Sequence, residues 1–167
     1  FFDVTAWLQT MGEAGAWKYM DALHENIAQY THSGSKPCRQ AGAGEFVVGI
    51  SFDFRANDTK AKGAPVELIF PTEGLGWDIE SSGIVKTTKK LDAAKKLMDW
   101  TATKEANEAY AKNFVIVAHP GVKSKLAHIP ADLEKRLIKN DFAFAAKNRD
   151  KILAEWNKRY AGKTEAK

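Results

Sequence analysis

Small polar residues beside a helix start are the first side chains suited to binding a charged ligand. Ser33, Gly34 and Ser35 precede Lys36 and Pro37, and proline favours the first turn of a helix. Backbone N–H groups and hydroxyls at such a turn can bind a phosphate, phosphonate or carboxylate. The same pattern also fits an ordinary helix cap, so both interpretations stay open.

Acidic and aromatic residues follow two apolar runs farther along the chain. Ser51 and Asp53 come after the run at residues 46–50, and loops that leave parallel strands often carry ligands. Asp53 could meet an ammonium group or could only cap the Lys-rich helix behind it. Glu73 and Trp77 follow the second run in a Gly-rich loop and could add a carboxylate and an aromatic wall.

Catalytic and metal-binding patterns do not appear in the sequence. There is no nucleophile elbow, P-loop, dinucleotide fingerprint or His-Glu-x-x-His helix. Cys38, the single cysteine, lies near a helix start that would favour a thiolate, but nothing around it indicates a substrate. No histidine stands four residues from another histidine or from the cysteine; the four histidines are His24, His32, His119 and His128. We therefore expect no enzymatic activity, no cofactor and no metal.

The composition predicts a folded globular chain. Hydrophobic residues make up 44 % of the 167 positions, and the aromatic residues are scattered throughout, unlike in disordered segments. The net charge of +4 raises the question of a nucleic-acid partner, but lysines alternate with acidic residues, as at 89–96. That pattern is typical of a solvated helix face. No apolar stretch approaches the length of a membrane span, so we expect neither nucleic-acid binding nor a membrane-embedded chain.

Short apolar runs alternate with helical patterns along the chain, which predicts an α/β fold with mostly parallel sheet. The predicted strands are residues 46–50, 66–70, 82–85 and 114–118. The predicted helices are one ending near Gly12, one carrying Trp17, Met20, Leu23 and Ile27, one starting at Lys36, one closed by Gly63, one from Leu91, one capped by Thr103, one opened by Pro130 and one carrying Ile152, Leu153, Trp156 and Tyr160.

Residues 30–51, 63–74 and 93–100 resemble the C-terminal part of type 2 periplasmic solute-binding proteins of ABC transporters, nearest to the 2-aminoethylphosphonate-binding branch. The resemblance implies an incomplete two-lobed α/β protein of the periplasmic binding protein type 2 kind, with sheets flanked by helices and ligand in the cleft. Residues 1–65 would form the C-terminal part of the second, inserted lobe. Residues 66–167 would form the cross-over and the C-terminal part of the first lobe. The abrupt apolar start suggests a cut within a longer protein, which would also remove a signal peptide.

The resemblance carries ligand contacts onto matching positions of this chain. Ferric-ion binders in the family place paired tyrosines where Phe52, Asp53 and Phe54 stand, and phenylalanine cannot ligate iron, so iron is disfavoured. An Asp among aromatic residues suits an amine. The implied ligand-binding residues are Ser33, Gly34, Ser35, Ser51, Phe52, Asp53, Glu73 and Trp77.

The resulting expectation is a periplasmic carrier that binds a small zwitterion or anion reversibly and presents it to the membrane permease of an ABC importer. The expected ligand is 2-aminoethylphosphonate, with serines at the phosphonate and Asp53 or Glu73 at the amine. The alternatives are another solute, such as iron, thiamine, a polyamine or another organic anion, or the effector-sensing half of a regulator with the same fold.

Overall fold

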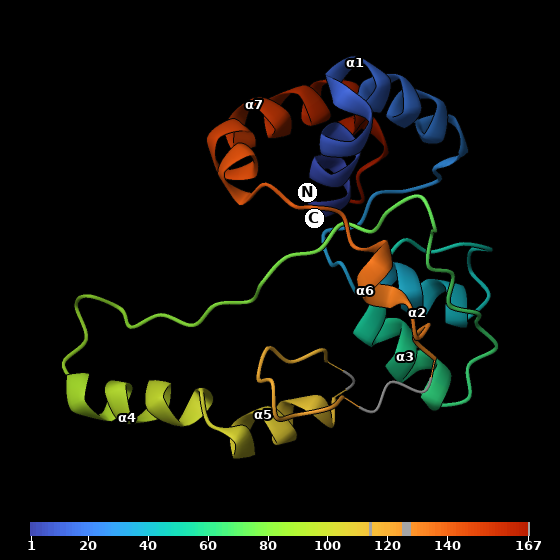
Figure 1. The fold of residues 1–167 in the computed structure, drawn as a ribbon. Helices are drawn as coiled ribbons and strands as arrows, with labels where there is room; N and C mark the ends of the chain where they lie inside the picture. The colour runs from blue at the N-terminus through green and yellow to red at the C-terminus, as the bar shows by residue number, and fades with distance from the viewer. Residues whose placement is uncertain (114, 125–127, 167) are drawn as a thin grey trace. The chain divides into compact units, whose positions relative to one another are not determined.

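The computed structural model describes residues 1–113, 115–124 and 128–166. Within this part of the chain the regular structure is helical, and the only β pairing consists of two isolated bridges. In chain order the elements are α1 (Phe2–Asn26), α2 (Lys36–Gly42), α3 (Asp53–Ala61), α4 (Leu91–Thr101), α5 (Lys104–Ala111), α6 (Leu133–Arg136), α7 (Phe142–Tyr160) and the 3-10 turn η1 (Ala161–Lys163), as Figure 1 shows.

The chain divides into two compact units, each made of segments distant in sequence. Unit 1 comprises Phe1–Gly34, Ile69–Asp78 and Pro130–Lys167. Unit 2 comprises Ser35–Leu68 and Ile79–Ile129. The predicted lobes of a longer protein, with a boundary between residues 65 and 66, stay a prediction.

The predicted parallel sheet is wrong for the described residues. Residues 46–50, 66–70, 82–85 and 115–118 contain neither helix nor strand, and Phe114 lies outside the described residues. A strand is stable only beside a neighbour that shares its backbone hydrogen bonds, and an isolated pair is marginal in water. The apolar runs therefore have strand-like composition without the pairing that would make them strands.

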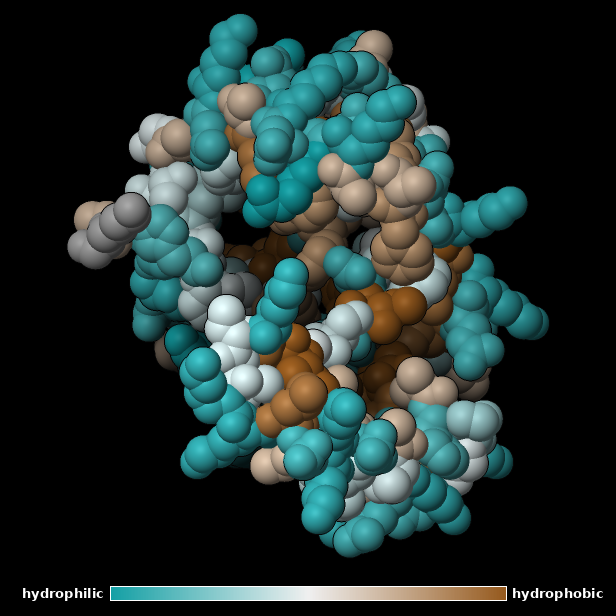
Figure 2. Space-filling model, turned by 90° about the vertical axis from the view of Figure 1, so that its left-hand side faces the viewer, coloured by the Kyte–Doolittle hydropathy of each residue, from teal (hydrophilic) through white to brown (hydrophobic). Residues whose placement is uncertain are grey.

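The unpaired apolar runs expose side chains that a sheet would cover. Val47 is 101 % exposed, Ile69 84 % and Val85 71 %. Figure 2 shows hydrophobic side chains open on one face of the molecule. Between residues 64 and 70, half-buried and exposed residues alternate strictly, as they do along a strand. The local pattern of a strand is thus present in that segment without a ladder.

The predicted helix starts and stops are largely confirmed. A break at Gly12, whose φ is 71°, divides α1 into the two predicted helices. Gly63, with φ of 89°, follows α3, and the Thr103 hydroxyl caps α5 by accepting the Ala106 N–H at 3.2 Å. The helix expected at Pro130 is short: α6 begins only at Leu133, whose N–H donates to the Pro130 carbonyl at 3.0 Å.

Unit 1 has an aromatic-rich core between the two long helices. The buried cluster is Val4, Leu8, Ala16, Trp17, Met20, Ile152 and Tyr160, with Trp7, Tyr30, Phe144 and Trp156 packed against it. The Tyr160 hydroxyl donates to Asp21 at 2.8 Å, and Arg159 makes two hydrogen bonds to the same carboxylate. This polar group closes one side of the core without leaving the buried hydroxyl unsatisfied.

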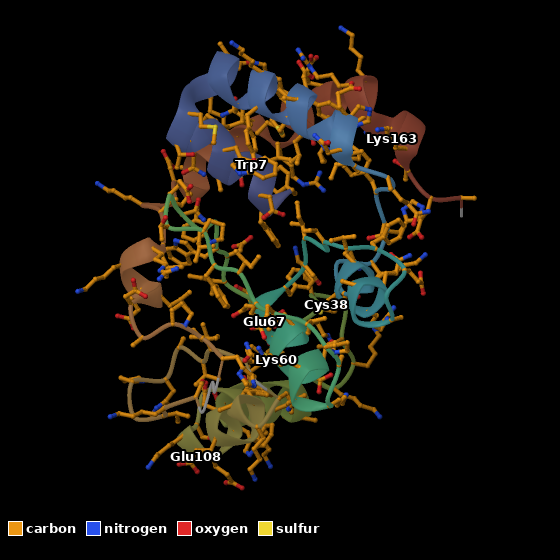
Figure 3. The ribbon with its side chains drawn as sticks, turned by 90° about the vertical axis from the view of Figure 1, so that its right-hand side faces the viewer. Trp7, Cys38, Lys60, Glu67, Glu108 and Lys163 are labelled. Atoms are coloured by element: carbon orange, nitrogen blue, oxygen red, sulfur yellow. The ribbon has the colours of Figure 1, made fainter. Side chains whose placement is uncertain are left out.

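Unit 2 packs α2 against α3 through small side chains. The buried Cys38 thiol donates to the Thr59 hydroxyl at 3.4 Å. A Cβ added to Gly42 would lie 3.0 Å from Thr59 Cγ2, so the glycine allows the close approach of the two helices. Lys60 pairs with Glu67 at 2.6 Å and ties the end of α3 to the segment that follows (Figure 3).

Candidate functional site

The predicted ligand-binding residues fall into two groups, one in each unit. Unit 2 contains Ser35, Ser51, Phe52 and Asp53. Unit 1 contains Ser33, Gly34, Glu73 and Trp77.

The start of α3 carries the acidic member of the unit 2 group. Phe52 is the N-cap residue with extended backbone (φ −74°, ψ 141°), and Asp53 occupies the first turn. A carboxylate there is favoured by the helix dipole. Burial raises the pKa of Asp53 and outweighs the backbone N–H groups of Phe54 and Asp53, which lower it. The result is a half-buried carboxyl that can gain from a new hydrogen-bond donor or cation.

Aromatic residues precede and follow Asp53 in the sequence. The rings of Phe52 and Phe54 stack with centroids 5.6 Å apart and planes 20° apart. The Arg55 guanidinium lies 4.9 Å from the centroid of the Phe54 ring. Phe52 is 40 % exposed, so its ring is open to contact. The start of α3 therefore carries a carboxyl, an exposed aromatic ring and a cation within four consecutive residues.

Asn57 stabilises the same turn of α3 and was not predicted from the sequence. Its side chain is 0 % exposed, and its Nδ2 donates to the Asp53 carbonyl at 3.1 Å. Its Oδ1 is buried and has no hydrogen-bond partner within the described part of the chain. The spacing of four residues from Asp53 would have placed both on one helix face, which was the available signal.

The start of α2 approaches the segment that leads into α3. Ser35 is the N-cap of α2 and Pro37 lies in its first turn, as predicted. A Cβ added to Gly49 would clash with the Pro37 carbonyl, so the glycine permits this contact. Unit 2 thus brings the chain beside Ser35 close to the chain that precedes Ser51. With only seven residues, α2 is itself a weak anion site.

In unit 1 the predicted ligand-binding residues differ in their hydrogen bonds and exposure. The Thr31 hydroxyl donates to the Ser33 carbonyl at 2.8 Å. Glu73 is exposed, and its carboxylate accepts the Thr72 hydroxyl at 3.4 Å. Glu73 therefore lies at the surface and can reach a solute, whereas the neighbouring Trp77 has a clear structural role.

Trp77 joins its segment to the chain before α7. The indole N–H donates to the Ile138 carbonyl at 2.8 Å, and the ring meets Phe142 edge-on at 5.3 Å. The Asn140 amide donates to the Trp77 carbonyl at 2.6 Å. Leu75 and Leu137 form a parallel bridge alongside. Because its N–H is already used, Trp77 could offer a ligand only its ring.

A hollow elsewhere in unit 2 has a different character. It measures about 230 Å³ and is lined by Gly83, Ile84, Val85, Thr88, Ala94, Leu97 and Met98. The lining holds one hydroxyl and no charged group, and none of the predicted ligand-binding residues contributes to it. Such a hollow offers no partner to a charged solute.

Among the described residues, no group of three His, Cys, Asp or Glu side chains is arranged to hold a metal ion. No helix in the same part of the chain is long and apolar enough to cross a membrane.

Comparison with known proteins places the chain in a family. Residues 3–145 match the model of the bacterial extracellular solute-binding proteins. A protein of Haemophilus influenzae, described as uncharacterized, is 36 % identical over 105 residues, which are 63 % of this chain and 30 % of that protein.

A solved structure is similar over most of the chain. It is the periplasmic binding protein AfuA from Actinobacillus pleuropneumoniae with exogenous fructose-6-phosphate bound, at 33 % identity and a TM-score of 0.82. The match covers 95 % of this chain and 51 % of AfuA, so the chain spans about half the length of that protein. The predicted periplasmic binding protein fold is confirmed to this extent.

These matches bear directly on the predicted class of protein. The family consists of solute-binding proteins rather than enzymes, which agrees with the prediction of no enzymatic activity. From the family match and the shared fold, we conclude that this chain belongs to the bacterial extracellular solute-binding protein family.

Proposed function

We propose that the chain is the ligand-binding part of an ABC importer's solute-binding protein and that its solute is a small phosphorylated sugar. The observation that carries this proposal is the 33 % identity, over 95 % of the chain, to a protein with fructose-6-phosphate bound. The residues at the start of α3 fit such a solute, because a carboxyl and an exposed aromatic ring are typical partners of sugar hydroxyls and sugar faces.

Asp53 is the residue we assign to the sugar. Its raised pKa reflects lost hydration, and a hydroxyl donor from the solute would replace that hydration. Phe52 would contact the apolar face of the ring. Ser35 and Ser51, with the backbone amides near them, would meet the phosphoryl group, since hydroxyls and N–H groups bind such oxygens well.

The rival solute is 2-aminoethylphosphonate. Its ammonium group would meet Asp53, and its phosphonate would take the place of the phosphoryl group. The half-buried Asp53 also suits this rival solute, because the ammonium group of 2-aminoethylphosphonate would stabilise the ionised Asp53 carboxylate. The two solutes differ in the groups that accompany the phosphoryl or phosphonate group. Fructose-6-phosphate carries several hydroxyls, whereas 2-aminoethylphosphonate carries a single ammonium group.

Isothermal titration calorimetry on the chain separates the two solutes. We expect fructose-6-phosphate to bind with micromolar affinity and fructose alone to give no heat. The variant Asp53→Asn should weaken binding by about tenfold or more, because a hydrogen bond to a charged group contributes about 1.5–3 kcal/mol. Asp58→Asn is the matched control on the same helix, where the carboxylate pairs with Lys62 at the surface.

The outcomes of the titration are distinct. Tighter binding of 2-aminoethylphosphonate than of the sugar phosphate would replace the proposed solute with its rival. If both solutes bind but Asp53→Asn and Asp58→Asn behave alike, the assignment of Asp53 is wrong. If neither binds, the solute class is wrong.

The permease of an ABC importer is the proposed partner, and the periplasm is the proposed location. Membership of an extracellular solute-binding family supports both. A regulator that senses an effector with the same fold remains the alternative from another class. A DNA-binding domain encoded in the same gene would favour the regulator.

A further inference from the structure

We propose that residues 163–165 clamp the segment 30–34 and thereby hold the chain that leads directly into Ser35, a residue of the proposed phosphoryl site. This inference rests on the proposed function, because only that function gives Ser35 a role in binding. The clamp itself is a set of contacts within unit 1.

Backbone hydrogen bonds join the two segments in the manner of a short parallel pair. The Tyr30 N–H donates to the Lys163 carbonyl at 2.9 Å, and the Glu165 N–H donates to the Tyr30 carbonyl at 2.9 Å. Tyr30 and Thr164 form an isolated parallel bridge. The C-terminal segment therefore satisfies both backbone groups of the residue at the root of the loop.

Glu165 extends the clamp toward the predicted ligand loop. Its Oε1 accepts the His32 backbone N–H at 2.7 Å, and the His32 ring Nε2 lies 3.1 Å from the Glu165 carbonyl oxygen. Between them, the Thr31 hydroxyl donates to the Ser33 carbonyl at 2.8 Å. Each residue from Tyr30 to Ser33 is thus held by at least one hydrogen bond. A charged acceptor on a backbone N–H is among the stronger hydrogen bonds available at a surface.

The clamp is anchored to the core at both ends. Lys163 donates from Nζ to the carbonyls of His24 at 2.6 Å and Ile27 at 2.8 Å, where α1 ends (Figure 3). A cation is favoured at a helix C-terminus, where carbonyls lack partners within the helix. The Tyr30 hydroxyl meets His24 Nδ1 at 2.9 Å, and its ring packs edge-on against Trp156 at 4.9 Å.

The position of the clamp along the chain connects it with the proposed site. Gly34 is the last residue of the first segment of unit 1, and Ser35 begins unit 2, so the clamp holds the chain just before Ser35.

The test uses Glu165→Ala in the full chain, with Glu134→Ala as a control that removes an exposed carboxylate from α6. Amide hydrogen exchange measured by NMR should show the His32 N–H exchanging about three- to tenfold faster in Glu165→Ala and unchanged in the control. Calorimetry with fructose-6-phosphate, or with 2-aminoethylphosphonate if that is the solute, should show about threefold weaker binding in Glu165→Ala only.

Lys163→Met provides a second variant and Lys158→Met its control, since both remove one positive charge from the last residues of the chain. We expect faster exchange at Tyr30 and His32 only in Lys163→Met. Unchanged exchange in both test variants overturns the clamp. Faster exchange with unchanged affinity overturns its role in positioning the loop. A wild-type chain that binds neither solute counts against the proposed function. In that case the amide exchange rates alone test whether the clamp exists.

Discussion

The two units cover their apolar side chains to different extents. Unit 1 buries a continuous cluster between α1 and α7, including Trp17, Met20 and Tyr160. In the described part of unit 2 the buried residues are Cys38, Asn57 and Ala106, and none of them has a large apolar side chain. The difference shows that helices form from local signals in both units, whereas a core requires segments that face one another.

The largest expected effect on stability comes from comparing one tryptophan in each unit. Trp17 is 8 % exposed in the core of unit 1, and Trp100 on α4 is 41 % exposed. Trp17→Ala should lower the free energy of unfolding by about 3–5 kcal/mol, because it opens a cavity in packed surroundings. Trp100→Ala should cost less than about 1 kcal/mol, since it removes a partly exposed side chain. Urea unfolding followed by far-UV circular dichroism measures both, and equal losses would contradict the comparison.

A smaller effect comes from the polar group that closes the core of unit 1. Tyr160→Phe removes the hydrogen bond to Asp21 and should cost about 1 kcal/mol at neutral pH. The pKa of Asp21 is held below its ordinary value, first by the Tyr160 hydroxyl and then by Arg159. Ionised Asp21 therefore stabilises the fold above the ordinary value of 3.8, and this contribution is lost as the pH falls through the lower folded value.

Thermal unfolding between pH 7 and pH 2 measures that dependence. Tyr160→Phe should flatten the loss of stability at acid pH, because less depression of the Asp21 pKa remains. An unchanged slope below pH 4 would show that the hydrogen bond does not couple to the fold.

The smallest expected difference concerns helix caps, which act locally in both units. Thr103 accepts the Ala106 N–H in unit 2, and Asp141 accepts the Phe144 N–H at 2.9 Å in unit 1. Replacing either by alanine should cost about 1 kcal/mol. Similar losses would show that capping is independent of the core around it. A loss confined to Asp141→Ala would mean that the helices of unit 2 contribute little to cooperative unfolding.

Helices were predictable because their signals lie within a few residues. Gly12, Pro37, Gly63 and Thr103 each mark a boundary where the structure has one. Strands could not be predicted in the same way, because a strand needs hydrogen bonds to a segment that is distant in the sequence. The run at 46–50 has a buried strand's composition, yet Val47 is fully exposed.

The candidate site was predictable in part for the same reason. Asp53 and Ser35 lie at helix starts, as their sequence context indicated. Asn57 was missed because its one local signal, the spacing of four residues from Asp53, does not distinguish a buried amide from an exposed one. The contact between Glu165 and His32 spans most of the chain, so no local pattern could reveal it. Whether the eight predicted residues bind a solute stays a prediction.

A titration of the ¹⁵N-labelled chain with fructose-6-phosphate, followed by amide NMR, tests the central claim most directly. We expect saturable shifts at the amides of Ser35, Ser51 and Asp53, and their loss in Asp53→Asn. Saturable shifts confined to the apolar hollow around Leu97 and Val85, or no shifts with any phosphorylated or phosphonate solute, would contradict it.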